Sequence, residues 1–218
     1  VIDNPRRVRA EIVREIPLRE TSYYLDGLMS DTPRAFLGAL APQTPEYARL
    51  MGAKLRLENT IAHGGWGATV PSGKFEPGDT GAGVVALRDR LIAMGYLDRT
   101  VTARYDASIT EAVRLFQENH GLEVDGIAGG STLDQINTTP QDRLKSVIVA
   151  MERERWINMP GGLGQRHILV NLTDFNARIF DDGKLTFETR SVIGHQERDR
   201  QTPEFSDEMD HMVINPSW

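Results

Sequence analysis

Apolar residues recur at helical spacing in the middle of the chain, between residues 76 and 137. Four of them are separated by 3, 4 and 3 positions and predict a helix with one apolar face: Val84, Leu87, Leu91 and Met94. A second helix is expected to begin near Asp106, with Ser108 and Glu111 as a capping box, and to end at Gly121. Ser131 or Thr132 is expected to cap a short third helix. Three short amphipathic helices enclose one small core.

The pattern on either side of this segment divides the rest of the chain. Thr44-Pro45-Glu46 is a helix start whose helix is expected to end at Gly64-Gly65, and residues 1–40 give no clear assignment. The expected apolar stripe of that helix consists of Tyr47, Leu50, Met51, Leu55 and Ile61. A connecting helix is expected to begin at Thr139-Pro140. Its expected buried stripe consists of Leu144, Val147, Ile148 and Met151.

After residue 160 the period of the apolar positions changes from that of a helix to that of a strand. Four strands are predicted: His167–Leu172, Phe175–Phe180, Leu185–Ile193 and Met212–Ile214. Asp181-Asp182-Gly183 predicts a hairpin turn, because glycine tolerates a positive φ. We therefore expect an α+β protein with four parts: a helical scaffold (1–75), a three-helix bundle (76–137), a connecting helix (138–160) and a β-rich region (161–218).

Composition excludes several classes of function. The chain has 25 Lys and Arg against 31 Asp and Glu, a net charge of −6, and no basic block. Nucleic-acid binding needs clustered Lys and Arg to neutralise phosphates, so a three-helix nucleic-acid reader is disfavoured. No apolar run reaches the roughly 18 residues of a membrane span. With 0 Cys, these residues hold neither a disulfide, nor a thiolate metal site, nor a cysteine nucleophile.

The run AVRLFQENHGLEVDGIAGGSTL, residues 112–133, resembles the peptidoglycan-binding domain found on many cell-wall enzymes. Gly81, Val84, Leu87 and Leu91 of the preceding helix belong to the same resemblance, which spans about 60 residues. It implies a three-helix fold and peptidoglycan as partner. Most of the matching residues are expected to serve as core, caps and turns rather than as ligand contacts.

Ordered motifs around this segment resemble the large L,D-transpeptidases of Gram-negative bacteria, in which a peptidoglycan-binding domain is inserted before a YkuD-type catalytic β domain. These motifs are Gly64-Gly65-Trp66, Asn137-Thr138-Thr139-Pro140, Arg155-Trp156, His167–Asn171, Val192-Ile193-Gly194, Thr202-Pro203 and Asn215-Pro216-Ser217-Trp218. The resemblance implies crosslinking in the periplasm or cell envelope. A cysteine takes the acyl group of a tetrapeptide stem and passes it to a diaminopimelate amine.

The family's Ser-His-Gly-Cys signature is missing from this sequence, which starts at Val1 and stops at Trp218. We expect the catalytic segment to lie beyond Trp218 in a longer protein, for which membrane anchoring stays open. The 218 residues alone are then expected to be inactive. The alternative is a non-catalytic protein that binds peptidoglycan. The sequence identifies no soluble protein partner.

Few residues qualify as ligand contacts. His195, Arg198 and Thr202 lie in a charged loop and are expected to bind substrate, with the arginine meeting a stem carboxylate. No catalytic residue is assigned. The five histidines show no metal-ligand spacing, and no cofactor is implied. Trp66 is open to two interpretations, stacking on a sugar or pinning its own glycine-rich loop.

Overall fold

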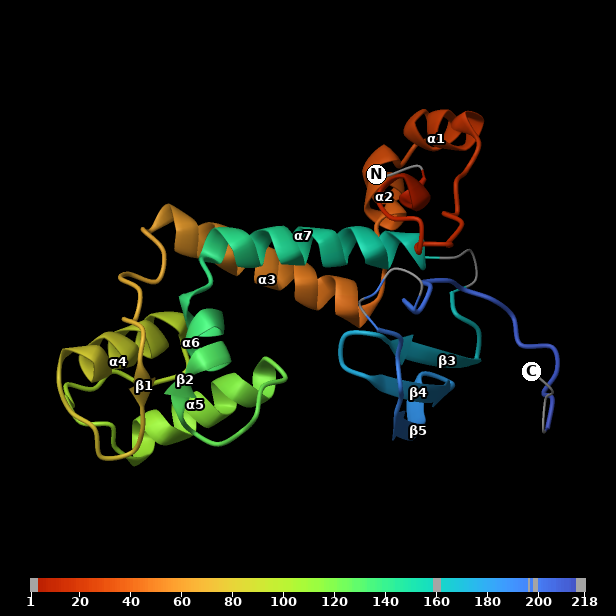
Figure 1. Cartoon of the computed structure of the whole chain (residues 1–218). Coiled ribbons are helices and arrows are strands. Elements are labelled where there is room, and N and C mark those ends of the chain that lie inside the picture. Colours follow the sequence, from red (N-terminus) through yellow and green to blue (C-terminus); the bar gives the residue numbers. More distant parts are fainter. Residues whose placement is uncertain (1–3, 159–161, 196, 198–199, 215–218) are drawn as a thin grey trace. The chain divides into compact units, whose positions relative to one another are not determined.

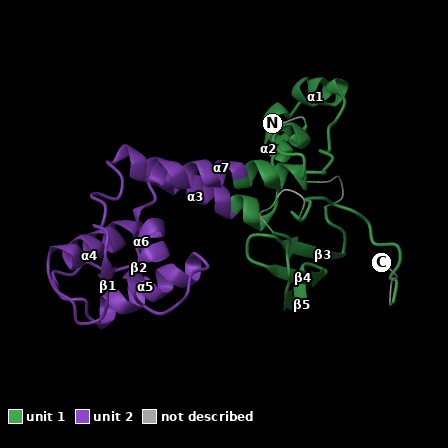
Figure 2. Ribbon diagram, in the orientation of Figure 1, with its two compact units in different colours: residues 1–48, 150–218 green, residues 49–149 purple. Residues whose placement is uncertain are grey.

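The computed structural model describes residues 4–158, 162–195, 197 and 200–214. The chain forms two compact units: residues 1–48 with 150–218 (unit 1), and residues 49–149 (unit 2) (Figures 1 and 2). The described part of the chain contains helices, a two-stranded antiparallel sheet set among them, and a three-stranded antiparallel sheet after the last helix, so the expected α+β class is confirmed. Every helix within the described residues is too short or too polar to cross a bilayer.

Unit 2 contains most of two long helices and, between them, a bundle of three helices with a short two-stranded sheet. Its elements in chain order are β1 (Lys74–Phe75), α4 (Ala82–Met94), α5 (Ala107–Asn119), β2 (Ala128–Gly129) and α6 (Gly130–Asn137). Strand β1 pairs antiparallel with β2, which places Lys74 opposite Gly129. Helices α3 (Pro45–Ala62) and α7 (Pro140–Trp156) lead into and out of this bundle. The three helices expected between residues 76 and 137 are thus confirmed.

The core of unit 2 consists of the apolar positions that the helical spacing selects. Leu87 and Leu91 on α4 and Ile109, Val113 and Phe116 on α5 are fully buried. Leu133 and Ile136 close the core from α6, and Gly95 ends α4 in the left-handed conformation with φ 82°. Burial of each large side chain contributes about 1.5–3 kcal/mol. These helices therefore owe their stability to one shared core.

Helix α5 begins next to Asp106 as predicted, but the capping groups of α5 and α6 differ from those expected. Asp106, not Ser108, caps α5: its Oδ1 accepts the backbone N–H groups of Ser108 (3.0 Å) and Ile109 (3.2 Å). The Ser108 hydroxyl donates to the same carboxylate, and these bonds lower the pKa of Asp106. Glu111 pairs with Arg114 instead of closing a capping box. Helix α6 begins at Gly130 after Gly129, so Ser131 and Thr132 do not cap it.

A buried arginine joins the two linkers of the bundle, an arrangement we call the Arg90 clasp. The Arg90 guanidinium donates to the carbonyls of Gly67 (3.1 Å), Ile136 (3.1 Å) and Thr138 (3.3 Å). Its Cζ lies 5.6 Å from the centroid of the Trp66 ring, a cation–π contact. Only 3 % of Arg90 is exposed, and this burial lowers its pKa. Trp66 thus packs against Arg90 beside its own loop, which agrees with the interpretation that it pins this loop.

The same linkers are joined a second time by Asn137. Its side chain accepts from the Val70 N–H (2.8 Å) and donates to the Val70 carbonyl (2.9 Å). Val70 itself is buried. The backbone of Val70, before the first helix of the bundle, is therefore hydrogen-bonded to the side-chain amide of Asn137, the last residue of α6.

Unit 1 contains a three-stranded antiparallel sheet in the order β3 (Arg166–Asn171), β4 (Asn176–Asp181), β5 (Lys184–Arg190). The hairpin between β4 and β5 turns at Asp182 (φ 49°) and Gly183 (φ 75°), as the sequence predicts. The strand expected at Met212–Ile214 is wrong: these residues form no strand, pair with no other strand among the described residues, and are 60–82 % exposed. A strand needs a partner ladder, and no neighbour supplies one there.

The remaining elements of unit 1 are η1 (Pro5–Arg7), α1 (Thr21–Leu28), α2 (Pro33–Leu40) and the facing ends of α3 and α7. Arg155 on α7 donates to the Tyr47 hydroxyl on α3 (2.5 Å), and the Thr44 hydroxyl donates to Glu154 (3.2 Å). Trp156 is 4 % exposed and donates to Glu152. The start of α3 and the end of α7 are thus fixed to one another.

The stripes predicted for α3 and α7 are wrong in part. Met51, Leu55 and Ile148 are 37 %, 57 % and 48 % exposed, whereas Tyr47 and Met151 are buried. Helical spacing shows which residues share a face but not whether another element covers the whole length of that face. The four-part division of the chain stays a prediction.

Candidate functional site

A depression of about 320 Å³ lies on unit 2 beside the β1–β2 ladder. It is lined from three directions: Lys74 on β1, Gln117 on α5, and the segment that leads from α5 into α6, which contributes Glu123, Asp125, Ile127 and residues 129–132. The ladder places Lys74 opposite Gly129, so the first and last parts of the bundle meet at this point. The depression is therefore built only after the bundle has folded.

Gln117 organises the floor of the depression. Its Nε2 lies within hydrogen-bond distance of Asp125 Oδ1 (2.8 Å), the Ile127 carbonyl (3.1 Å) and Thr132 Oγ1 (3.1 Å). Its Oε1 accepts from the Gly126 N–H (2.9 Å), and the residue is 1 % exposed. One buried amide thus fixes the α5–β2 loop against the start of α6, since a buried polar group needs all of its partners.

Charges of both signs line the rim. The Asp125 carboxylate accepts from the Ile127 N–H (2.9 Å) and from Gln117, and these bonds lower its pKa. Lys74 Nζ lies 2.5 Å from Glu76 Oε2, and this carboxylate raises the pKa of Lys74. Lys74 and Asp125 are therefore both charged at neutral pH. The depression can meet a ligand that carries a carboxylate and an ammonium group.

The residues expected to bind substrate lie in unit 1, in the loop of residues 194–202. The Thr202 hydroxyl accepts from the Gly194 N–H (2.6 Å), and the His195 N–H donates to the Arg200 carbonyl (2.8 Å). A Cβ on Gly194 would lie 2.1 Å from that carbonyl oxygen, so only glycine fits this neck. The structure thus brings His195 and Thr202 together at the neck of one loop, while Arg198 lies outside the described residues.

The side chains of this loop have partners of their own. His195 is exposed, and its Nδ1 accepts from the Glu197 N–H (3.3 Å). Directly after the loop, Glu204 forms a parallel bridge with Ile12 and ion pairs with Arg14 (3.8 Å) and Arg153 (3.5 Å). The loop is therefore closed by its neck and anchored behind it. Its role in binding substrate stays a prediction.

The other histidines that the structure holds tightly serve packing. His120 stacks on Phe116 with ring centroids 3.9 Å apart, and its Nδ1 bonds the Phe116 carbonyl (2.7 Å). Burial lowers the pKa of His120. His167 stacks on Phe180 across β3 and β4. Across the described ranges, no three His, Asp or Glu side chains are placed to hold a metal ion.

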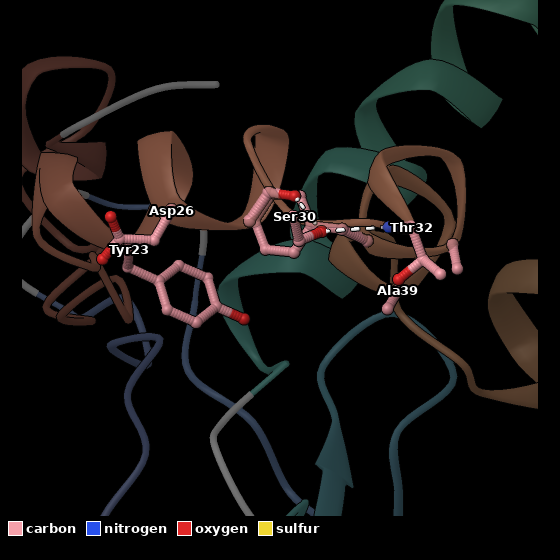
Figure 3. A pocket seen from close by; sticks show the side chains of 8 residues that line it. Tyr23, Asp26, Ser30, Thr32 and Ala39 are labelled. Atoms are coloured by element: carbon pink, nitrogen blue, oxygen red, sulfur yellow. Dashed lines mark hydrogen bonds between the residues drawn. The ribbon is translucent and has the colours of Figure 1, made fainter.

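A second pocket, of about 530 Å³, lies in unit 1 between α1 and α2. Figure 3 shows Tyr23 and Asp26 at one end and Thr32 and Ala39 at the other. The Ser30 hydroxyl between them is used within the turn, where it donates to the Gly27 carbonyl (2.7 Å) and accepts from the Thr32 N–H. The other polar side chains of this pocket are those of Tyr23, Asp26 and Thr32.

Comparison with known proteins assigns part of unit 2 to a described domain. Residues 80–136 match the family model described as "Putative peptidoglycan binding domain". The match covers α4, α5 and α6 with the loops between them, and it confirms the resemblance seen in residues 112–133. Gln117, Asp125 and Thr132 of the depression lie inside this peptidoglycan-binding domain, whereas Lys74 lies just before it.

The relatives cover only part of the chain. The "N-acetylmuramoyl-L-alanine amidase CwlM" of Mycobacterium tuberculosis is 42 % identical over an alignment of 65 residues, and the match covers 25 % of this chain and 16 % of that protein. A fused Zn-dependent amidase/peptidase/peptidoglycan-binding protein of Clostridium acetobutylicum is 21 % identical with a TM-score of 0.28, covering 58 % of this chain and 65 % of the other. An L,D-transpeptidase of Xylanimonas cellulosilytica is 23 % identical with a TM-score of 0.26, covering 60 % and 54 %.

These similarities cover only part of each related protein. The chain spans a sixth or less of the curated relative and less than two thirds of each solved chain. TM-scores below 0.3 carry no argument about the fold of this chain. The peptidoglycan-binding domain is thus the part that the comparisons identify.

Sequence reasoning named none of the residues that line the depression as a ligand contact. Gln117 lies at helical spacing from Val113, and a long amide among apolar positions is a signal for a satisfied internal contact. Lys74 carries no local signal, because only the β1–β2 register brings it beside Gly129, far along the chain.

Proposed function

We propose that this chain docks on peptidoglycan through the depression of its peptidoglycan-binding domain. The observation that supports it is the coincidence of two findings: the family match over residues 80–136, and a depression lined with fixed polar groups inside the matched helices. Binding sites combine a concave surface with a few positioned polar groups in this manner. Docking on the wall places the protein in the cell envelope, and the periplasm follows from the resemblance to Gram-negative enzymes.

Filling the depression tests this proposal. Ser131 lies exposed at its edge, so Ser131→Phe is expected to leave the core intact and to lower the fraction of protein retained on purified sacculi several-fold. Ser146→Phe, at an exposed position on α7 in the same unit, is the matched control and is expected to be retained like the unchanged chain. Equal retention of both variants in a co-sedimentation assay contradicts docking through this depression.

We propose further that docking serves a cell-wall enzyme, and that its reaction is L,D-transpeptidation. The ordered motifs on both sides of the bundle support this, together with the loop of residues 194–202, where His195, Arg198 and Thr202 are proposed to meet the stem. The nucleophilic cysteine is proposed to come from a further segment of a longer protein, because these residues contain none. The thiolate attacks the stem carbonyl and forms a thioester, while the bond to the terminal D-residue breaks and that residue leaves as a free, protonated amine. The amine of a second stem then attacks the thioester, forms the amide crosslink, loses its proton and releases the thiolate.

The competing function is a non-catalytic protein that binds the wall, which the lack of cysteine favours. A carbapenem acylates a reactive cysteine of this enzyme class, so intact mass spectrometry separates the two functions. A longer protein that contains this chain is expected to gain the mass of one carbapenem, and its Cys→Ser variant is expected to gain none. Absence of an adduct on a folded longer protein rejects the transpeptidase and leaves the wall-binding protein.

A further inference from the structure

The depression on unit 2 has a chemical character that distinguishes between the two components of peptidoglycan. None of its lining residues is aromatic, and its rim carries one ammonium group and two carboxylates: Lys74, Glu123 and Asp125. Sugar rings are held chiefly by stacking on aromatic side chains together with hydrogen bonds. Stem peptides carry carboxylates, amides and, at the diamino acid, an amine.

We infer that the depression binds the peptide stem rather than the glycan strand, with a stem carboxylate on Lys74 and a stem ammonium group on Glu123 and Asp125. This inference rests on the proposed docking function and names the part of the wall that is recognised. A ligand with charges of both signs pairs with the ammonium group of Lys74 and with the carboxylates of Glu123 and Asp125. An uncharged sugar would leave these ions desolvated without a counter-charge.

Lys74 is suited to receive a carboxylate. It sits at the start of the β1–β2 ladder opposite Gly129, and 63 % of its side chain is exposed. Glu76 occupies one direction of its ammonium group, and an ammonium group has three protons to donate. A stem carboxylate can therefore add to Lys74 without displacing Glu76.

The Asp125 carboxylate is held in one orientation before any ligand arrives. Its Oδ1 accepts from Gln117 Nε2 and from the Ile127 N–H, and Gln117 is itself buried and bonded to Thr132 and Gly126. Oδ1 is used by the fold, which leaves Oδ2 for a ligand. Such preorganisation reduces the entropy lost on binding. Gln117 is thus a positioning residue for the acidic side of the depression.

The test measures binding of two soluble probes to the full chain by isothermal titration calorimetry. A synthetic stem tetrapeptide that contains diaminopimelate is expected to bind, and chitotetraose, an uncharged N-acetylglucosamine oligomer, is not. Lys74→Met is expected to weaken tetrapeptide binding about tenfold, the effect of losing one charge-assisted hydrogen bond. Lys145→Met is the matched control with unchanged affinity, because Lys145 is also exposed in unit 2 and also pairs with a nearby carboxylate, that of Asp142.

Changing the peptide locates each contact. Amidation of the stem carboxylates is expected to weaken binding to the unchanged chain and to have little further effect on Lys74→Met. Acetylation of the diaminopimelate amine is likewise expected to weaken binding to the unchanged chain and to have little further effect on binding to Glu123→Gln. Thermal unfolding followed by circular dichroism must be the same for the variants and the unchanged chain, which is expected for exposed side chains.

The possible results separate this inference from the function on which it rests. Retention on sacculi together with binding of chitotetraose but not of the tetrapeptide overturns the inference and leaves docking in place. Equal affinity of Lys74→Met and the unchanged chain for the tetrapeptide also overturns it. Failure to be retained on sacculi overturns both.

Discussion

Replacing Phe116 by alanine is expected to lower the free energy of unfolding of unit 2 by about 3–5 kcal/mol, the usual cost of removing a buried aromatic ring. Phe116 is fully buried at the centre of the bundle, where its ring packs against Tyr96 (5.1 Å between centroids) and stacks on His120. The ring touches side chains from two directions, so its loss leaves a cavity that the short helices cannot close. Urea unfolding followed by circular dichroism measures the change.

The residue next to it provides the control for this prediction. Leu115 lies on the same helix with 47 % of its surface exposed, so Leu115→Ala is expected to change the free energy of unfolding by no more than about 0.5 kcal/mol. Both variants lose side-chain volume at adjacent positions of one helix. The difference between their free energies of unfolding therefore measures the contribution of the buried position. Similar midpoints for the two variants would show that the described core does not hold unit 2 together.

Replacing Arg90 by methionine is expected to lower the free energy of unfolding of unit 2 by about 3 kcal/mol. Methionine keeps much of the volume of the arginine stem but leaves the carbonyls of Gly67, Ile136 and Thr138 without their donor, and each buried unsatisfied group costs about 1–3 kcal/mol. Arg90→Lys is expected to recover only part of the loss, because one ammonium group cannot reproduce the planar guanidinium. Urea unfolding again measures the change.

Arg88→Met is the comparison for the clasp. Arg88 lies on the same helix, donates to one carbonyl, that of Thr102 (2.6 Å), and pairs with its neighbour Asp89. Its loss is expected to cost about 1 kcal/mol, in line with one hydrogen bond near the surface. If Arg88→Met and Arg90→Met destabilise unit 2 equally, the three bonds of the clasp do not act as described.

The helices of unit 2 were predictable because one local signal is enough for each. The spacing of Val84, Leu87 and Leu91 puts them on one face, and only a neighbouring helix can cover that face in so short a segment. Helix starts were less predictable: Asp106 and Ser108 are both good caps, and the choice between them depends on where the preceding turn ends. Met212–Ile214 has the composition of a strand, but pairing depends on a neighbour that local sequence does not reveal.

The candidate site was less accessible to sequence reasoning than the fold. The resemblance in residues 112–133 gave the ligand class, and the family match supports it. It did not give the depression, since Lys74 joins Gln117 and Asp125 only through strand register. The Arg90 clasp was equally hidden, because three backbone carbonyls carry no sequence signature. His195 and Thr202 were placed in one loop correctly, yet the hydroxyl of Thr202 is used to close that loop.

The two hydrogen bonds between Val70 and Asn137 bear on how this bundle can be inserted into other proteins. A segment whose first and last residues hydrogen-bond one another can be inserted into a host protein, or removed from it, without parting the ends of the host chain. The bundle is thus an insertable domain whose two ends are joined by hydrogen bonds. The docking function proposed for the bundle would move with it from one host protein to another, while the helices on either side keep their own partners.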